Sequence, residues 1–191
     1  MNINTKNLVS ITDANQNFSK VARLVDENGS VIILKNNVPR YLVIEFSAAE
    51  QEQLATDEDV MAISKRLIEK IEQEALRRNK PSVIAVCTPD GNPVAVHVMD
   101  GSFLVSFDMA VKKAYTSVAV KMSTMELSRL TQPGQTFYGL GKMSDNIVIF
   151  GGGVPLKVGD TIIGGLGISG GTGEEDNSLA EYGLQVLKEV L

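Results

Sequence analysis

The 191-residue sequence has very little of the side chains from which most disulfide and metal sites are built. It contains one cysteine, Cys87, one histidine, His97, and no tryptophan. A single cysteine excludes an intrachain disulfide, and a single histidine excludes a histidine-rich metal centre. Any imidazole chemistry must therefore use His97. The lone cysteine and the lack of a signal-peptide pattern lead us to expect a cytoplasmic protein.

Basic charge and long apolar runs are also missing. The formal net charge is −5 and the sequence pI is about 5.0. This balance disfavours broad non-specific binding to nucleic acid, although a local basic patch stays possible. No apolar run approaches the roughly 20 residues that span a bilayer, so we expect no membrane partner.

Residues 1–46 predict a small β-α-β-β unit. A weak strand is followed by a helix from Thr12 or Asp13 to about Glu27, because apolar residues recur there at helical spacing. Two β-rich runs, 31–34 and 41–46, flank a polar loop and predict a hairpin. A unit of this size buries little core, so we expect it to dimerise. The polar residues 47–57 predict a linker or short helix.

Residues 58–191 predict a larger α+β domain. Helices are expected over 60–78, 106–122, 125–130 and 174–191, and strands on either side of an Asp90–Gly91 turn and over 147–150, 154–157 and 161–168. Strands joined as hairpins form an antiparallel sheet, and the amphipathic helices must pack on it. The sequence therefore predicts an α/β sandwich with an antiparallel sheet.

The glycine-rich stretch near the C-terminus matches two catalytic patterns. Gly165–Gly170 fits G-x-G-x-x-G, and Gly167–Gly171 fits G-x-S-x-G. A dinucleotide site needs a second strand after the next helix, and the chain ends at Leu191 before one can form. A hydrolase needs a histidine after the nucleophile, whereas His97 precedes Ser169. Neither pattern predicts an active site here.

Structural reasons explain the glycines better. Ten glycines lie between Gly151 and Gly173. Glycine within strands marks bends or the close approach of another backbone, a ligand or a subunit. Thr172 and Glu175 form a T-x-x-E capping box at the start of the last helix. The acidic residues of this first turn would repel a phosphate.

The runs PDGNPVAVHVMDGSFLVSFDMAVKKA, KKAYTSVAVKMSTMELSRL and FGGGVPLKVGDTIIGGLGISGGTGEEDNSLAEYGLQVL resemble the GlcG/HbpS-like family, which includes the C-terminal domain of PduO-type proteins. The resemblance covers residues 58–191. It implies a profilin-like α/β/α sandwich, assembly into homo-oligomers, and haem as the cofactor of some members. Haem breakdown or redox sensing has been proposed for members of the family.

The run ITDANQNFSKVARLVDENGSVIILKNNVPRYLVI resembles the Phd/YefM antitoxin N-terminal domain over residues 1–46. The resemblance implies a homodimer that binds operator DNA. The family often carries arginine where this chain has Asn15 and Lys35, and Arg40 adds another basic side chain. The second domain replaces the usual toxin-neutralising tail, so a toxin partner is not expected. A purely dimerising role for this unit stays open.

Five residues of the second domain are candidate ligand contacts. His97 could be a haem axial and metal ligand, or a hydrogen-bonded core residue. Lys113 could pair with a propionate or another carboxylate, or lie on a solvated helix face. The resemblance implies roles for Thr116 and Thr124, for which capping and packing are alternatives. Asp100 is a ligand candidate whose simplest role is in a turn.

The sequence thus predicts a ligand-responsive regulator. An antitoxin-like head that binds DNA or dimerises is joined to a domain that binds a small apolar ligand or tetrapyrrole. No catalytic constellation supports an enzyme, although haem degradation or redox chemistry stays an alternative. A structural oligomer without catalytic activity is the third possibility.

Overall fold

The computed structural model describes residues 7–45 and 57–191. The chain divides into two compact units, Met1–Gln53 and Leu54–Leu191. Residues 46–56, which include nearly all of the predicted linker, lie outside the described residues.

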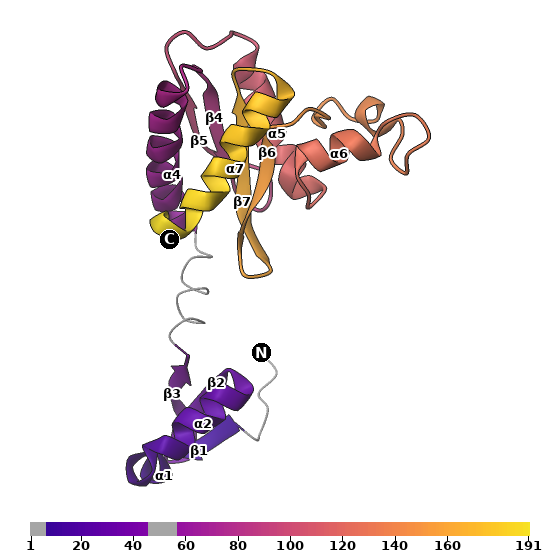
Figure 1. Cartoon of the computed structure of the whole chain (residues 1–191). Helices are drawn as coiled ribbons and strands as arrows, with labels where there is room; N and C mark the ends of the chain where they lie inside the picture. The colour runs from indigo at the N-terminus through magenta and orange to yellow at the C-terminus, as the bar shows by residue number, and fades with distance from the viewer. Residues whose placement is uncertain (1–6, 46–56) are drawn as a thin grey trace. The chain divides into compact units, whose positions relative to one another are not determined.

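The N-terminal unit is a three-stranded sheet with two helices on one face (Figure 1). Its elements are β1 (Leu8–Ser10), α1 (Ile11–Gln16), α2 (Phe18–Asn28), β2 (Ser30–Lys35) and β3 (Val38–Ile44). The strand order is β1-β2-β3, with β1 parallel and β3 antiparallel to β2. The core consists of Val9, Ala14, Val21, Val25, Val31 and Ile33.

The single helix predicted for this unit is in fact two helices. Asn17 interrupts it with φ −147° and ψ 73°, and its side chain accepts a hydrogen bond from the Lys20 amide. Asparagine competes with the helix for backbone groups in this way and favours caps over helix interiors. Phe18, an apolar residue within the predicted helix, is 61% exposed. The prediction of one continuous helix was therefore wrong at Asn17.

The C-terminal unit has three layers, with the antiparallel sheet β5-β4-β7-β6 in the middle (Figure 1). Helices α4 and α7 cover one face and α5 covers the other. The elements are α4 (Asp57–Arg77), β4 (Val83–Cys87), β5 (Pro93–Val98), α5 (Ser106–Ala119), α6 (Thr124–Leu130), η2 (Leu140–Lys142), β6 (Gly153–Val158), β7 (Thr161–Ser169) and α7 (Gly173–Val190).

Glycines in β7 allow α5 to lie directly on the sheet. A methyl group added at Gly167 would meet the carbonyl oxygen of Ala110, and one at Gly165 would meet that of Ala114. Any side chain at either position would push the helix away. The expectation that the glycines serve close backbone packing is confirmed at these two positions.

Two further expectations have opposite outcomes. The capping box is present, since Glu175 N donates to Thr172 Oγ1 and Thr172 N donates to Glu175 Oε2. The strand expected over residues 147–150 was wrong, because this segment pairs with no strand. Instead, Val148 N donates to the side chain of Thr116 at 3.0 Å. Within the described ranges no helix is long and apolar enough to cross a membrane.

Candidate functional site

Lys113 lies in the interior of the C-terminal unit and is only 2% exposed. Its Nζ donates to Asp176 Oδ2 at 2.6 Å and to the Ile168 carbonyl at 2.8 Å. The other carboxylate oxygen, Asp176 Oδ1, accepts the amides of Gly170 and Gly171 at 2.9 and 2.8 Å. Burial lowers the pKa of Lys113 below its ordinary value, and the charge of Asp176 opposes that shift. The carboxylate that Lys113 meets belongs to the chain itself.

The segment 151–153 encloses this ion pair. Gly152 has φ +115°, and a methyl group there would lie 2.8 Å from Asp176 Cβ and 3.0 Å from Lys113 Nζ. Lys113 is therefore not on a solvated helix face, which was one of the two alternatives for it. Its predicted contact with a ligand propionate stays a prediction.

Thr116 and Thr124 hold the stretch from Val148 to Gly153 from two helices. Thr116 Oγ1 donates to the Lys112 carbonyl at 2.7 Å and accepts the Val148 amide. Thr124 Oγ1 accepts the Gly153 amide at 2.8 Å. Both side chains are fully buried. The structure thus brings Lys113, Thr116 and Thr124 together along one seam, where each has partners within the chain.

His97 and Asp100 lie apart from that seam. His97 is paired with Ile84 across β5 and β4, and its Nε2 lies 3.0 Å from Glu72 Oε1 of α4. The two atoms are close enough for an ion pair, but they do not have the geometry of a hydrogen bond. The Nε2 atom is shielded from solvent. Asp100 is exposed in the turn after β5. The structure does not place His97 where Nε2 could bind a ligand without moving the ring.

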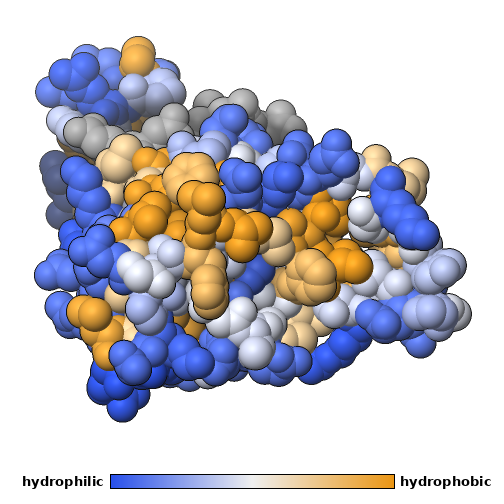
Figure 2. Space-filling model, turned by 90° about the horizontal axis from the view of Figure 1, so that it is seen from above, coloured by the Kyte–Doolittle hydropathy of each residue, from blue (hydrophilic) through white to orange (hydrophobic). Residues whose placement is uncertain are grey.

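An exposed apolar surface surrounds the start of α5. We use the name apolar surface for Val98, Phe103, Leu104, Val105 and Phe107, of which Leu104 is 98% exposed. The segment between α6 and β6 adds the exposed Phe137, Tyr138, Met143 and Phe150. Figure 2 shows apolar side chains gathered over one face of the molecule. Large exposed apolar patches mark sites for a ligand or a partner.

Sequence reasoning missed this surface. The run Phe103-Leu104-Val105 has neither helical nor strand periodicity, and it follows an Asp-Gly turn. Three consecutive apolar residues in a loop were the available signal, because such residues are exposed unless something covers them.

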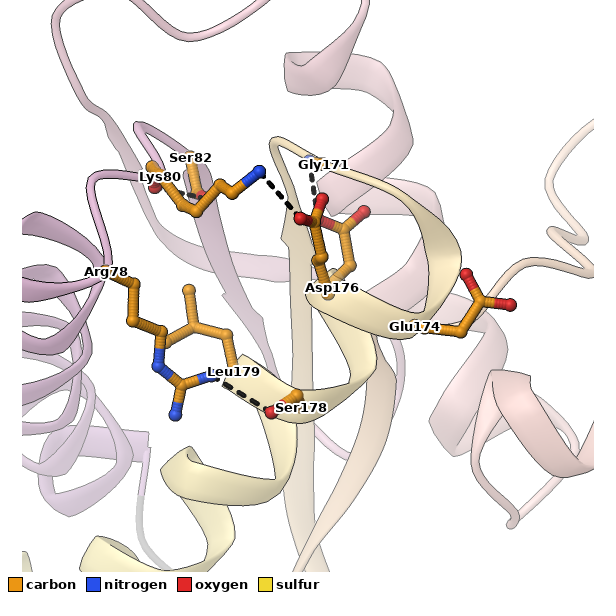
Figure 3. Close-up of a pocket in the computed structure, with 9 residues that line it drawn as sticks. Arg78, Lys80, Ser82, Gly171, Glu174, Asp176, Ser178 and Leu179 are labelled. Carbon is orange, nitrogen blue, oxygen red and sulfur yellow. Dashed lines mark hydrogen bonds and ion pairs between the residues drawn. The ribbon is translucent and has the colours of Figure 1, made fainter.

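A cavity of about 310 Å³ lies between the end of α4 and the start of α7 (Figure 3). Arg78 and Lys80 line one side, and Glu174, Glu175 and Leu179 line the other. Lys80 Nζ is 2.6 Å from Glu175 Oε1. Sequence reasoning could not find this cavity, because nearly a hundred residues separate its two sides. Within the described ranges, no group of three or more histidine, cysteine, aspartate or glutamate side chains could hold a metal ion.

Comparison with known proteins identifies the family. Residues 61–185 match the family described as "Haem degrading protein HbpS-like". An uncharacterized 15.0 kDa protein from the dhaT–dhaS intergenic region of Citrobacter freundii is 37% identical over 142 residues, which are 74% of this chain and 99% of that protein. The chain therefore belongs to the HbpS-like family.

Another relative is a longer protein. The corrinoid adenosyltransferase PduO of Citrobacter freundii is 35% identical over 158 residues, which are 80% of this chain and 47% of the relative. The chain thus spans about half the length of PduO.

Solved structures agree with the family assignment. The crystal structure of the Klebsiella pneumoniae protein ORFY has a TM-score of 0.62 and 31% identity, over 81% of this chain and 97% of that chain. The crystal structure of a PduOC–haem complex has a TM-score of 0.61 and 37% identity, over 63% of this chain and 88% of that chain. These likenesses support the mixed α+β fold with its antiparallel sheet. Neither of these two likenesses shows an antitoxin-like N-terminal unit.

Haem, the group that the family description names, can be compared with the two candidate surfaces. Haem has two broad apolar faces, and the apolar surface has exposed apolar side chains that could contact such a face. The cavity, in contrast, has charged side chains on both of its sides. Because side chains alternate along a strand, Val98 points to the α5 side of the sheet while His97 points to α4. The apolar surface fits the macrocycle, and His97 in its present position does not reach that surface.

Proposed function

We propose that the C-terminal unit binds haem or another tetrapyrrole on the apolar surface. The observation that carries this proposal is the exposure of Phe103, Leu104 and Val105 side by side in one loop. Membership of the HbpS-like family and the likeness to a PduOC–haem complex support the choice of ligand. When bound, haem would supply redox chemistry at its iron. The chain's own residues would cover the macrocycle and exclude water.

Leu104 provides the sharpest test of the surface. Burying a leucine side chain contributes about 1.5–3 kcal/mol, and each 1.4 kcal/mol is tenfold in affinity. A haem titration followed by absorption should therefore show about tenfold or greater weakening in Leu104→Asp. Leu76→Asp is the matched control, because Leu76 is also exposed but lies on α4, outside the apolar surface. Equal weakening in both variants would contradict the proposed surface.

The proposed role of His97 as axial ligand can be tested separately. The ring must leave Glu72 before Nε2 can bind iron. If His97 ligates, Glu72→Gln should strengthen haem binding and His97→Ala should abolish the specific Soret shift. If the shift survives in His97→Ala, the ligand is another residue, and His97 serves to pack β5 against α4. Asp100, Lys113, Thr116 and Thr124 stay proposed contacts, of which only Asp100 is exposed.

We further propose that the N-terminal unit forms a homodimer through the uncovered face of its sheet. The core residues Val31 and Ile33 point toward α1 and α2, so Ile32 and Leu34 point away from the helices. Leu42 is opposite Ile32 and is 49% exposed. An apolar sheet face without a helix is stable when a second copy covers it. Light scattering should show a dimer or larger homo-oligomer, and Leu42→Lys should reduce its size.

Operator binding is the proposed role of this dimer. Asn15, Lys35 and Arg40 are exposed on α1, β2 and β3, and in the described ranges neither basic side chain pairs with a carboxylate. Two copies would double the number of cations available to phosphates. A gel shift with the chain's own upstream DNA should show salt-sensitive binding that weakens in Lys35→Ala. Binding that is absent at low salt would refute the regulator and leave the unit a dimerising role.

The family description also favours an enzymatic alternative. Haem degradation would consume bound haem in the presence of a reductant and oxygen. Loss of the haem spectrum with formation of an open-chain product would support it. A stable spectrum under these conditions would favour binding without turnover.

A further inference from the structure

The cavity between α4 and α7 combines a guanidinium group with an apolar wall. Arg78 reaches α7 from the end of α4, and its Nη1 donates to Ser178 Oγ at 3.0 Å (Figure 3). Leu179 is buried and lines the same cavity. Lys80 extends from the segment after α4 toward the first turn of α7, where it pairs with Glu175. The cavity therefore has two cationic side chains on its α4 side.

The charge of Arg78 is only partly balanced. Glu74 is buried, and its single carboxylate receives hydrogen bonds from both Arg77 and Arg78, at 2.6 to 2.7 Å. These hydrogen bonds lower the pKa of Glu74 to about 2, and the bond from Arg77 has the larger effect. The Glu74 carboxylate therefore stays ionised near neutral pH. One carboxylate thus faces two guanidinium groups, and one positive charge is left over. In the described ranges Nη2 of Arg78 has no hydrogen-bond partner.

The acidic residues of α7 are engaged elsewhere. Asp176 is held by Lys113 and by the amides of Gly170 and Gly171. Glu175 is held by Lys80 and by the amide of Thr172, which together lower its pKa. The carboxylate of Glu174 is directed away from Arg78 (Figure 3). The amides at the helix start already donate to Asp176 and Glu175. Arg78 is therefore the group that remains available to an anion in the cavity.

We propose that this cavity binds a small carboxylate with an apolar body. The carboxylate would take a bidentate contact from Nη1 and Nη2 of Arg78, each of which keeps a free N–H. The apolar body would lie against Leu179. One water molecule takes about 30 Å³ of liquid volume, so a cavity of about 310 Å³ holds about ten non-hydrogen atoms. This size suits an aromatic or short-chain monocarboxylate. No residue of the apolar surface lines the cavity, so the two sites are separate.

Benzoate is a suitable probe for the whole chain. Amide resonances of Gly171, Ser178 and Leu179 should shift during a saturable titration. Arg78→Gln should weaken binding about tenfold, the loss expected when a charge-assisted bidentate pair is removed. Arg129→Gln is the matched control, because Arg129 is an exposed arginine of α6 that neither pairs with Glu74 nor lines the cavity. It should change binding by less than about twofold.

Three results would overturn the proposal. They are the absence of saturable binding by benzoate, equal weakening in the two arginine variants, and binding of inorganic phosphate as tight as that of benzoate. The last result would mean that charge alone attracts the anion. If Arg78→Gln fails to fold, Arg78→Lys keeps the charge, loses the bidentate geometry and should still weaken binding. Haem titration of the same variants should be unchanged, so this site and the tetrapyrrole surface can fail independently.

Discussion

Replacing Lys113 by methionine should strongly destabilise the C-terminal unit. The substitution nearly preserves side-chain volume but removes both hydrogen bonds of Nζ. It leaves the Asp176 carboxylate buried without its cation and the Ile168 carbonyl without its donor. A buried charge that loses its partner is far less favourable than the intact pair.

The expected magnitude follows from what Asp176 keeps. Breaking a buried ion pair by removing one partner costs about 3–5 kcal/mol. Asp176 still accepts the amides of Gly170 and Gly171, which partly compensate its charge. We therefore expect the lower end of that range, about 3 kcal/mol. For a unit of this size the loss corresponds to a fall of roughly 10 °C in Tm.

Urea and thermal unfolding followed by circular dichroism would measure this loss. Lys112→Met is the matched control on the same helix, because Lys112 is only half-buried. In a double-mutant cycle, Lys113→Met combined with Asp176→Asn should cost less than the sum of the two single substitutions. The reasoning would fail if Lys113→Met cost under about 1 kcal/mol, or no more than the control.

Two other substitutions test the remaining packing and charge. Glu74 has its pKa lowered from 4.5 to about 2 by Arg77 and Arg78, so it contributes stability above pH 4.5 that is lost as the pH falls toward 2. The difference in unfolding free energy between the wild type and Glu74→Gln should shrink over that range, and a constant difference would contradict the assignment. Gly167→Ala should lower Tm by several degrees, because the methyl group meets the Ala110 carbonyl. An unchanged Tm would show that α5 can shift without loss.

Local patterns predicted most elements because their causes are local. Helix α4 was expected over 60–78 and spans Asp57–Arg77, since one amphipathic stripe determines it. The β4–β5 hairpin followed from its Asp-Gly turn, and α7 from its capping box. The N-terminal helix was one exception, because one asparagine turned a continuous apolar pattern into two helices.

Contacts between distant residues could not be predicted in the same way. Lys113 and Asp176 are 63 residues apart, and nothing in either local sequence marks the other as a partner. From the sequence, the acidic first turn of α7 was explained as a capped helix start that would repel phosphate. That explanation holds for Glu175, which caps the helix, but Asp176 turns inward to Lys113. The segment 147–150 was predicted to be a strand because it is a run of β-branched and aromatic residues. Nothing in the sequence shows that the side chain of Thr116 accepts the amide of Val148 instead.

The glycine-rich motif and the buried ion pair are parts of one arrangement. Gly152 leaves room for the ammonium group, while Gly170 and Gly171 direct their amides at the carboxylate. A nucleotide-binding loop would leave such amides free for phosphate, whereas here Asp176 accepts them. The Asp176 carboxylate therefore takes the place that an external anion would have in such a loop. Consequently the start of α7 is an internal joint between α5, β7 and α7, in which the backbone amides of the glycines bind a carboxylate of the chain itself.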